Sequence, residues 1–394
     1  MQTFNLTRLE KVISGPGSIG AIGEELDRRG ARRAVVVTSA SLGRSELLER
    51  VTSALGPRCA GVNAGAAQHA PQARVQAVAA MMEAVDADAI VSFGGGSAID
   101  TCKAASASRL EGRDMTEEAG PLDLALAFGP ITGGPTTKVG FPHIAVPTTL
   151  SAGSFTPGGG VTLEGGRGKR SVIDPRLQPC VAIHDPELCI ETPDRLWVST
   201  GIRALDHAVE AIYSKRAHAL TTALAVRAIR MLFEHLPRSL GADAESVRHR
   251  GQCLDAAWLS NFGGFNTGLG LSHAVSHQIG PAWDVPHGIT SCLTLAPSMR
   301  VIADLAPQRF GDIAEALRLP FDVADPRSGA LACADAVEAF VASFGLPTRL
   351  KALGIDGEDV ETLAEPVQRG LELFDALDRP LTLDEIRGLL RELR

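Results

Sequence analysis

Two short segments of the sequence concentrate side chains suited to proton transfer, metal binding or anion binding. In GIRALDHAVE, Arg203 and His207 lie four residues apart, and in GLSHAVSHQIG, His273 and His277 have the same spacing. Residues four apart lie on one face of a helix, so each pair is expected to point in one direction. His287 follows in VPHG. We expect these five side chains to converge at one site, whereas a single histidine is more often a hydrogen-bonded core residue.

The arginine decides which chemistry this set favours. Neutral imidazoles bind Zn²⁺ or Fe²⁺, but a guanidinium on the same helix face raises the electrostatic cost of placing a dication there. Arginine instead suits the bidentate capture of a carboxylate or the stabilisation of a developing oxyanion. Imidazoles titrate near neutral pH and can supply a proton. The alternative for Arg203 is a salt bridge with a nearby acid, Asp206 or Glu210.

Two loops rich in small residues suggest a nucleotide site. FGGGSAID (residues 93–100) follows an apolar run and precedes a helix expected over residues 101–107. Glycines let the backbone approach a phosphate closely, and the free amides at the start of a helix attract it. The spacing is not the usual G-x-G-x-x-G, and a tight turn is the alternative. PTTLSAGS (residues 147–154) follows another apolar run, and its hydroxyls suit either the nicotinamide side of a cofactor or an ordinary polar loop.

The elements around these segments predict two domains. Apolar runs predict strands over residues 34–38, 89–93, 143–146 and 180–183, with helices over residues 45–55 and 76–85. Strands that alternate with helices favour a parallel sheet with crossover connections. The stretch 110–140 is rich in Gly, Pro and Thr, and we expect a long loop there.

From about residue 192 a helical period dominates, as in the amphipathic stretches 221–236 and 330–344. The length of 394 residues also exceeds one ordinary hydrophobic core. The sequence therefore predicts a Rossmann-like parallel-sheet domain over residues 1–190 and a helical catalytic domain over residues 191–394. Ligands are expected in the cleft between them.

Composition excludes several classes of partner. The formal net charge is -8 and no segment carries a dense Lys/Arg run, which argues against nucleic-acid or anionic-membrane partners. The seven cysteines are scattered without a C-x-x-C, so neither a disulfide framework nor a thiolate zinc site is expected. No signal peptide or membrane-length apolar run is apparent. These observations predict a cytoplasmic protein that acts on a small-molecule substrate.

In combination, four segments resemble the iron-dependent alcohol dehydrogenase superfamily, which includes maleylacetate reductases, glycerol dehydrogenases and dehydroquinate-synthase-like proteins. These segments are GGGSAIDTCKA, PTTLSAGS, GIRALDHAVEA and GLSHAVSHQIGPAWDVPHG, and their order and separation match over roughly residues 10–300. The resemblance implies a dehydroquinate synthase-like architecture, NAD or NADP as cofactor, hydride transfer between the domains, and a homodimer.

The resemblance also implies which residues bind the cofactor. The glycine-rich loop would hold the pyrophosphate, the second loop would face the adenine, ribose and nicotinamide, and two later residues would lie nearby. The implied residues are Gly94, Gly95, Gly96, Ser97, Asp100, Thr148, Thr149, Ser154, Lys169 and Leu188. Ser39 stands where NAD-preferring relatives often carry an aspartate. No carboxylate repels a 2'-phosphate there, so NADP is expected to be accepted as well as NAD.

In metal-dependent members four side chains bind one divalent ion, and His207, His273 and His287 match three of these ligands. His277 matches a nearby histidine that is not a ligand, and Arg203 stands in place of the aspartate ligand. Maleylacetate reductases also lack this aspartate and work without metal. The resemblance therefore predicts a metal-independent reductase of a small unsaturated or oxo carboxylate, such as maleylacetate, in the degradation of aromatic compounds.

Three other functions stay open. The first is a divalent-metal-dependent alcohol dehydrogenase that uses the three histidines and a further ligand. The second is a dehydroquinate-synthase-like lyase, although no basic phosphate pocket is recognisable. The third is a catalytically silent nucleotide-binding protein, which the number of reactive side chains disfavours.

Overall fold

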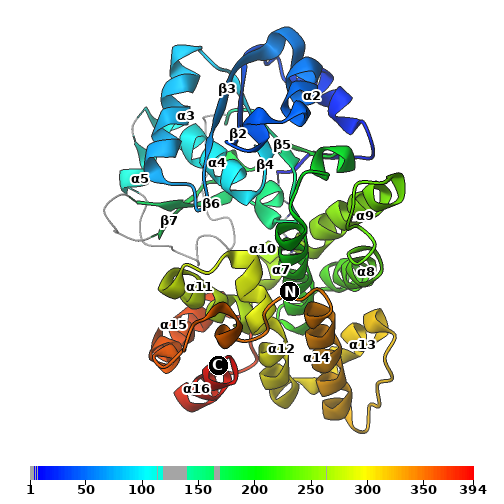
Figure 1. Cartoon of the computed structure of the whole chain (residues 1–394). Coiled ribbons are helices and arrows are strands. Elements are labelled where there is room, and N and C mark those ends of the chain that lie inside the picture. Colours follow the sequence, from blue (N-terminus) through cyan, green and yellow to red (C-terminus); the bar gives the residue numbers. More distant parts are fainter. Residues whose placement is uncertain are drawn as a thin grey trace. The chain divides into compact units, whose positions relative to one another are not determined.

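The computed structural model describes residues 4, 6, 8–112, 114–118, 140–163, 169–262 and 264–394. The chain forms two compact units (Figure 1). The first unit consists of Met1–Thr192 with Ala242–Leu254, and the second consists of Pro193–Gly241 with Asp255–Arg394. The loop expected over 110–140 lies largely outside the described residues, which there include the short helix α5 (Met115–Glu118).

The first unit contains a parallel sheet, as the sequence predicted. Its strands lie in the order β1 (Lys11–Ser14), β8 (Val181–His184), β5 (His143–Pro147), β4 (Ala89–Gly94), β2 (Ala34–Ser39) and β3 (Cys59–Ala66). The four inner strands are those that the apolar runs predicted. The two edge strands were not predicted, because KVIS is short and CAGVNAGA contains residues with a low preference for strands.

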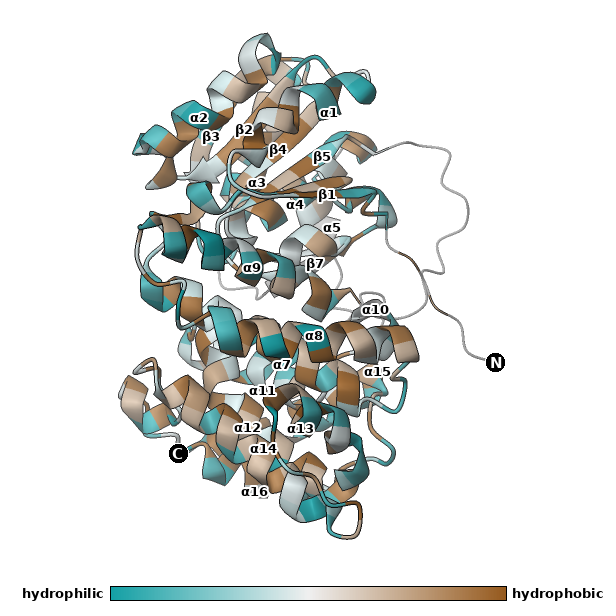
Figure 2. Ribbon diagram, turned by 90° about the vertical axis from the view of Figure 1, so that its right-hand side faces the viewer, coloured by the Kyte–Doolittle hydropathy of each residue, from teal (hydrophilic) through white to brown (hydrophobic). Residues whose placement is uncertain are grey.

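Helices cover both faces of this sheet, and alternate strand residues pack against each layer. Val36 belongs to the apolar cluster with α1 (Ile22–Arg28) and α2 (Glu46–Leu55). Val35 and Val37 belong to the cluster with α3 (Gln72–Ala84) and α4 (Gly96–Glu111). Figure 2 shows the strands coloured mainly as hydrophobic between these helices. A parallel sheet buried on both faces explains the almost continuous apolar runs in the sequence.

Helix α4 begins earlier than expected. The predicted start at Thr101 is wrong, because Gly96 is already helical and Gly95 is the N-cap. The carbonyl oxygen of Gly95 accepts hydrogen bonds from the amides of Ala98 and Ile99. The glycine-rich loop is therefore itself the first turn of the helix. An antiparallel hairpin, β6 (Gly158–Thr162) and β7 (Lys169–Ile173), follows β5 and was not predicted.

The described residues of the second unit contain helices and no strand, as predicted for this part of the chain. Its main helices are α7 (Asp194–Tyr213), α8 (Ala219–His235), α10 (Gly264–Thr267), α11 (Leu271–Trp283), α12 (His287–Leu305), α13 (Gly311–Leu317), α14 (Pro326–Ala342), α15 (Ala364–Phe374) and α16 (Leu383–Glu392). Helix α9 (Ala244–Asn261) begins in the first unit and ends in the second. Helix α7 packs against α8 and α12, and α12 packs against α11 and α14. No helix among the described residues is long and apolar enough to cross a membrane.

Candidate active site

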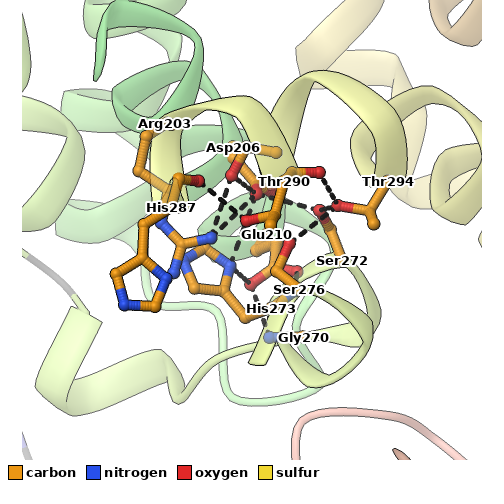
Figure 3. Close-up of polar contacts among 12 residues, drawn as sticks. Arg203, Asp206, Glu210, Gly270, Ser272, His273, Ser276, His287, Thr290 and Thr294 are labelled. Atoms are coloured by element: carbon orange, nitrogen blue, oxygen red, sulfur yellow. Dashed lines mark hydrogen bonds and ion pairs between the residues drawn. The ribbon is translucent and has the colours of Figure 1, made fainter. Parts of the chain in front are cut away.

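A buried polar cluster lies where α7, α11 and α12 meet (Figure 3). Helix α7 contributes Arg203, Asp206, His207 and Glu210, whose spacing places them on one helical face. Helix α12 approaches α7 closely, as Gly288 shows: a Cβ added there would lie 2.8 Å from the backbone of Ser199. Charged and ionisable residues thus occupy a face of α7 on which apolar residues would ordinarily be expected.

Glu210 joins the beginning of α11 to α7. One carboxylate oxygen, Oε2, accepts a hydrogen bond of 2.5 Å from the amide of Gly270, the N-cap of α11. The other oxygen, Oε1, accepts from the amide of His273 at 3.1 Å and from the hydroxyl of Tyr213 at 3.0 Å. The first amides of a helix lack intrahelical partners and favour a negative charge. Glu210 thus acts as the cap of α11, although it belongs to another helix.

The same carboxylate orients His273. Nδ1 of the imidazole lies 2.7 Å from Oε2 of Glu210. His273 is fully buried, and its other nitrogen, Nε2, has no hydrogen-bond partner among the described residues. A carboxylate beside one ring nitrogen fixes the ring and leaves the other nitrogen for a ligand or a proton.

Asp206 accepts hydrogen bonds from serines on both neighbouring helices. Its Oδ2 atom accepts from Ser272 at 2.8 Å and from Ser291 at 2.7 Å. The hydroxyl of Ser272 also lies 2.8 Å from that of Thr294, which in turn lies 2.9 Å from the hydroxyl of Ser276. Asp206 is fully buried, and Oδ1 has no hydrogen-bond partner among the described residues.

Arg203 lies at the edge of this cluster. Its Nη1 atom donates a hydrogen bond of 2.9 Å to Ser291 and lies 3.8 Å from Oδ2 of Asp206. The pairing with an acid that the sequence left as an alternative is therefore present, but mostly through the serine. The side chain is 12% exposed, and no other hydrogen bond of Arg203 occurs within the described part of the chain.

The four predicted histidines form a row. The ring centroids of His207 and His273 are 4.8 Å apart, those of His273 and His277 are 6.1 Å apart, and those of His277 and His287 are also 6.1 Å apart. The row begins at half-buried His207 on α7 and ends at exposed His287, the first residue of α12. The structure thus brings together residues that lie 80 positions apart in the chain.

Burial determines the charge state of this cluster. It lowers the pKa of His207 and of His273 well below the usual value, and the positive charge of Arg203 lowers both further. Burial raises the pKa of Asp206, where repulsion from Glu210 adds to the increase, and it also raises the pKa of Glu210. Both imidazoles are therefore neutral near neutral pH, with lone pairs available.

The two loops predicted to bind a cofactor lie side by side in the first unit. Gly94 at the end of β4 is paired with Pro147 at the end of β5, and the amide of Thr148 donates to the carbonyl of Gly94. A Cβ at Gly95 would lie 3.1 Å from Cγ2 of Thr149. A side chain larger than that of glycine would therefore crowd Thr149 where the loops touch. The N-cap of α4 has no side-chain hydrogen bond, which leaves its first amides for a ligand.

The polar side chains of these loops are mostly buried. The hydroxyls of Thr149 and Ser154 have no hydrogen-bond partner within the described residues. Lys103 on α4 is fully buried and donates to the carbonyls of Gly153 and Gly158 and to the hydroxyl of Thr156. This lysine ties the helix that begins at the glycine-rich loop to the second loop and to the hairpin.

The other predicted cofactor residues occupy varied positions. Ser39 ends β2 half-buried, with its hydroxyl 3.0 Å from that of Ser41, and half-buried Ser97 lies in the first turn of α4. Asp100 accepts a hydrogen bond of 3.2 Å from the amide of Gly160. Leu188 is fully buried in the apolar core, and Lys169 begins β7 with a side chain outside the described residues. Their roles toward a cofactor stay predictions.

The central role of the two buried acids was not predicted. The sequence suggested Asp206 and Glu210 only as partners of Arg203, and no sequence pattern indicated Ser272, Ser291 or Tyr213. One signal was present, because both acids recur with Arg203 and His207 on a single face of a largely apolar helix. Lys103 was also not singled out, although it is a charged residue in the run of small residues 101–108 of α4.

Both halves of the chain match family models. Residues 10–186 match the model of the iron-containing alcohol dehydrogenases, and residues 197–393 match the C-terminal model of the Fe-containing alcohol dehydrogenase family. The chain is 31% identical to the NAD-dependent methanol dehydrogenase of Bacillus methanolicus over 358 residues, 90% of each chain. It is 29% identical to the maleylacetate reductase of Rhizobium sp. strain MTP-10005, covering 93% of this chain and 91% of that one.

Similar solved structures include an alcohol dehydrogenase from Oenococcus oeni, with 27% identity and a TM-score of 0.87 over the whole of both chains. Family models thus span nearly the entire sequence, and relatives align along most of its length. The chain belongs to the iron-containing alcohol dehydrogenase family and is an oxidoreductase.

Proposed function

We propose that the protein is an NAD(P)H-dependent reductase of a small unsaturated or oxo carboxylate, similar to the maleylacetate reductases, and that it works without a metal ion. One observation carries this proposal: the guanidinium of Arg203 lies beside the histidine row, in the place that the resemblance assigns to an aspartate ligand. Within the described residues it uses a single hydrogen bond. A guanidinium has further N–H donors in a planar fork that matches a carboxylate.

The donor set fits an iron or zinc ion poorly. Among the described residues, one group brings three ligand atoms within 4.8 Å of one another, namely Asp206, Glu210 and His273. Three of its four carboxylate oxygens, both of Glu210 and Oδ2 of Asp206, already accept hydrogen bonds from amides and hydroxyls. Oδ1 of Asp206 has no hydrogen-bond partner among the described residues. The three histidines that match metal ligands in relatives do not gather as closely, and a cation lies beside them. No step of the proposed reaction therefore passes through a metal.

We further propose that residues 1–190 bind the dinucleotide and that residues 191–394 bind the substrate. The pyrophosphate would meet the first amides of α4, where the helix dipole favours negative charge. Reduction of a carbon–carbon double bond takes a hydride from NADH or NADPH at one carbon and a proton at the other, and leaves NAD⁺ or NADP⁺. Arg203 would hold the carboxylate and stabilise the negative charge that the hydride brings.

The histidine row would supply and replace the proton. Its fully buried member is His273, and from there it continues through half-buried His277 to exposed His287, so it links the interior of the cluster with solvent. Imidazoles can pass a proton because each has one nitrogen that donates and one that accepts. The homodimer and the cytoplasmic location inferred from the sequence stay predictions.

The test is a substrate screen with the purified protein. Maleylacetate, other enoates and 2-oxo acids should oxidise NADH or NADPH, and activity should survive treatment with a chelator. Size-matched uncharged aldehydes should react much more slowly. Activity restricted to alcohols and aldehydes, and restored after chelation only by Fe²⁺ or Zn²⁺, would instead identify a metal-dependent alcohol dehydrogenase. Turnover without net consumption of NADH would identify a lyase.

A further inference from the structure

We infer that Ser291 and Asp206 form a positioning pair, in which the serine hydroxyl holds the guanidinium of Arg203 at a fixed point and the buried carboxylate holds the serine. The inference rests on the proposed function, because it assigns Arg203 the substrate carboxylate. It concerns residues that do not themselves touch the substrate.

The directions of the hydrogen bonds at Ser291 are determined. Its Oγ lies 2.7 Å from Oδ2 of Asp206 and 2.9 Å from Nη1 of Arg203. A hydroxyl has a single hydrogen to donate, and arginine can only donate. Ser291 therefore donates to Asp206 and accepts from Arg203. The direct separation of 3.8 Å between Nη1 and Oδ2 is too long for a hydrogen bond, so the serine is the link.

Three helices fix the position of this link. Oδ2 belongs to α7, and it accepts one hydroxyl from α11 and one from α12. Asp206, Ser272 and Ser291 are all fully buried. The hydroxyl of Ser291 is therefore held in place by buried residues of the packed interior and not by a flexible surface group.

An arginine that binds a substrate must be held in one orientation and must still keep N–H donors for the substrate, and this arrangement meets both requirements. A long arginine side chain loses much rotational entropy when it is fixed, so an unsupported guanidinium would bind a substrate in many orientations. A direct two-pronged salt bridge with Asp206 would fix it but would occupy the donors that a substrate needs. With Ser291 between them, a single N–H of Arg203 is used within the described part of the chain. Asp206 stays close to the guanidinium, at 3.8 Å, without occupying its donors.

Four variants of the full-length protein test the inference: Ser291→Ala, Ser291→Thr, Arg203→Ala and the double variant of Ser291→Ala with Arg203→Ala. Ser298→Ala is the matched control. Ser298 is a buried serine on the same helix, and its hydroxyl has no hydrogen-bond partner among the described residues. Each variant is assayed for kcat and KM with the carboxylate substrate and with an uncharged aldehyde of similar size, and its Tm is measured.

We expect Ser291→Ala to lower kcat/KM for the carboxylate about ten-fold, the effect of one hydrogen bond to a charged group. The loss with the aldehyde should be smaller, because the aldehyde has no carboxylate for Arg203 to bind, and the KM for NADH should be unchanged. Ser291→Thr keeps the hydroxyl and should retain most of the activity. In the Arg203→Ala background, Ser291→Ala should have little further effect, because the two residues act as one unit.

Two results would overturn the inference. One is a loss in Ser291→Ala no larger than in Ser298→Ala at comparable Tm, and the other is additive losses in the double variant. These failures are distinguishable from failure of the proposed function. If Arg203→Ala itself leaves carboxylate reduction intact, the proposed function is lost. If Arg203→Ala is impaired and Ser291→Ala is not, the positioning pair alone is lost.

Discussion

The two polar regions of this protein are built in opposite ways. In the first unit, the loops around Gly95 and Thr149 offer backbone amides and small hydroxyls, and the buried charge tied to them is Lys103. In the second unit, the cluster around Arg203 and Asp206 gathers charged and ionisable side chains against a framework of serines and threonines. One region is shaped by the main chain and the other by side chains.

The difference predicts how each region responds to substitution. A site made of main-chain groups tolerates the loss of side chains but not the addition of atoms. A site made of buried charges tolerates little loss, because each removed partner leaves another charge uncompensated. Substitutions in the two regions should therefore affect different kinetic constants.

The largest effect is expected for Arg203→Ala. Loss of a charge-assisted contact with the substrate should lower kcat/KM for a carboxylate by roughly 100-fold or more. Arg203→Lys should recover only part of this loss, because lysine lacks the planar fork. Steady-state kinetics check both variants, with the KM for NADH as an internal control. Unchanged carboxylate reduction in Arg203→Ala would remove the arginine from the mechanism.

Gly95→Ala should act on the cofactor instead. The added methyl group would lie 3.1 Å from Cγ2 of Thr149, so the Thr149 side chain must shift by a few tenths of an ångström. Overpacking of this kind costs about 1–3 kcal/mol, and we expect the KM for NADH to rise about ten-fold. The matched control is Gly20→Ala, since a Cβ at Gly20 has no atom within 4 Å. Thr149→Ser removes the contacting methyl and should restore part of the affinity in the double variant.

Ser39→Asp should change the preference between cofactors. A carboxylate at the end of β2 would repel the 2'-phosphate of NADPH, and one such repulsion near the surface amounts to about 1 kcal/mol. The ratio of kcat/KM for NADPH to that for NADH should fall about five-fold. A proportional loss with both cofactors would show that the end of β2 is not near the ribose.

The smallest effect is expected from pH. Burial lowers the pKa of Lys103 to about 8, while Asp100 opposes this decrease. Below pH 8 the protonated amine donates to three oxygens, and above pH 8 the neutral amine has one donor fewer. The KM for NADH should therefore rise about three-fold as the pH increases through 8. Lys103→Arg stays charged and should flatten this dependence.

The sequence predicted elements whose pattern is local and strong. The inner strands β2, β4, β5 and β8 appear as apolar runs, because they are buried on both faces. Strand β3 contains two glycines and β6 contains three, so neither has a recognisable strand pattern. These strands form because a neighbouring strand supplies their hydrogen bonds.

The same distinction separates the predicted from the missed parts of the site. The histidines were found from their helical spacing, which is a local property. The role of Glu210 depends on the amide of Gly270, 60 residues away, and that of Asp206 depends on serines of two other helices. No local pattern records such contacts.

The cap that Glu210 provides to α11 has a mechanical consequence. Glu210 of α7 binds the first turn of α11, so the helices that carry His207 and His273 are joined directly at this point. A movement of α7 would therefore act on the first turn of α11, and on the ring of His273, through the carboxylate of Glu210. His287 begins a separate helix and is exposed, so it is the member of the row that we expect to shift when acceptors of different size are bound.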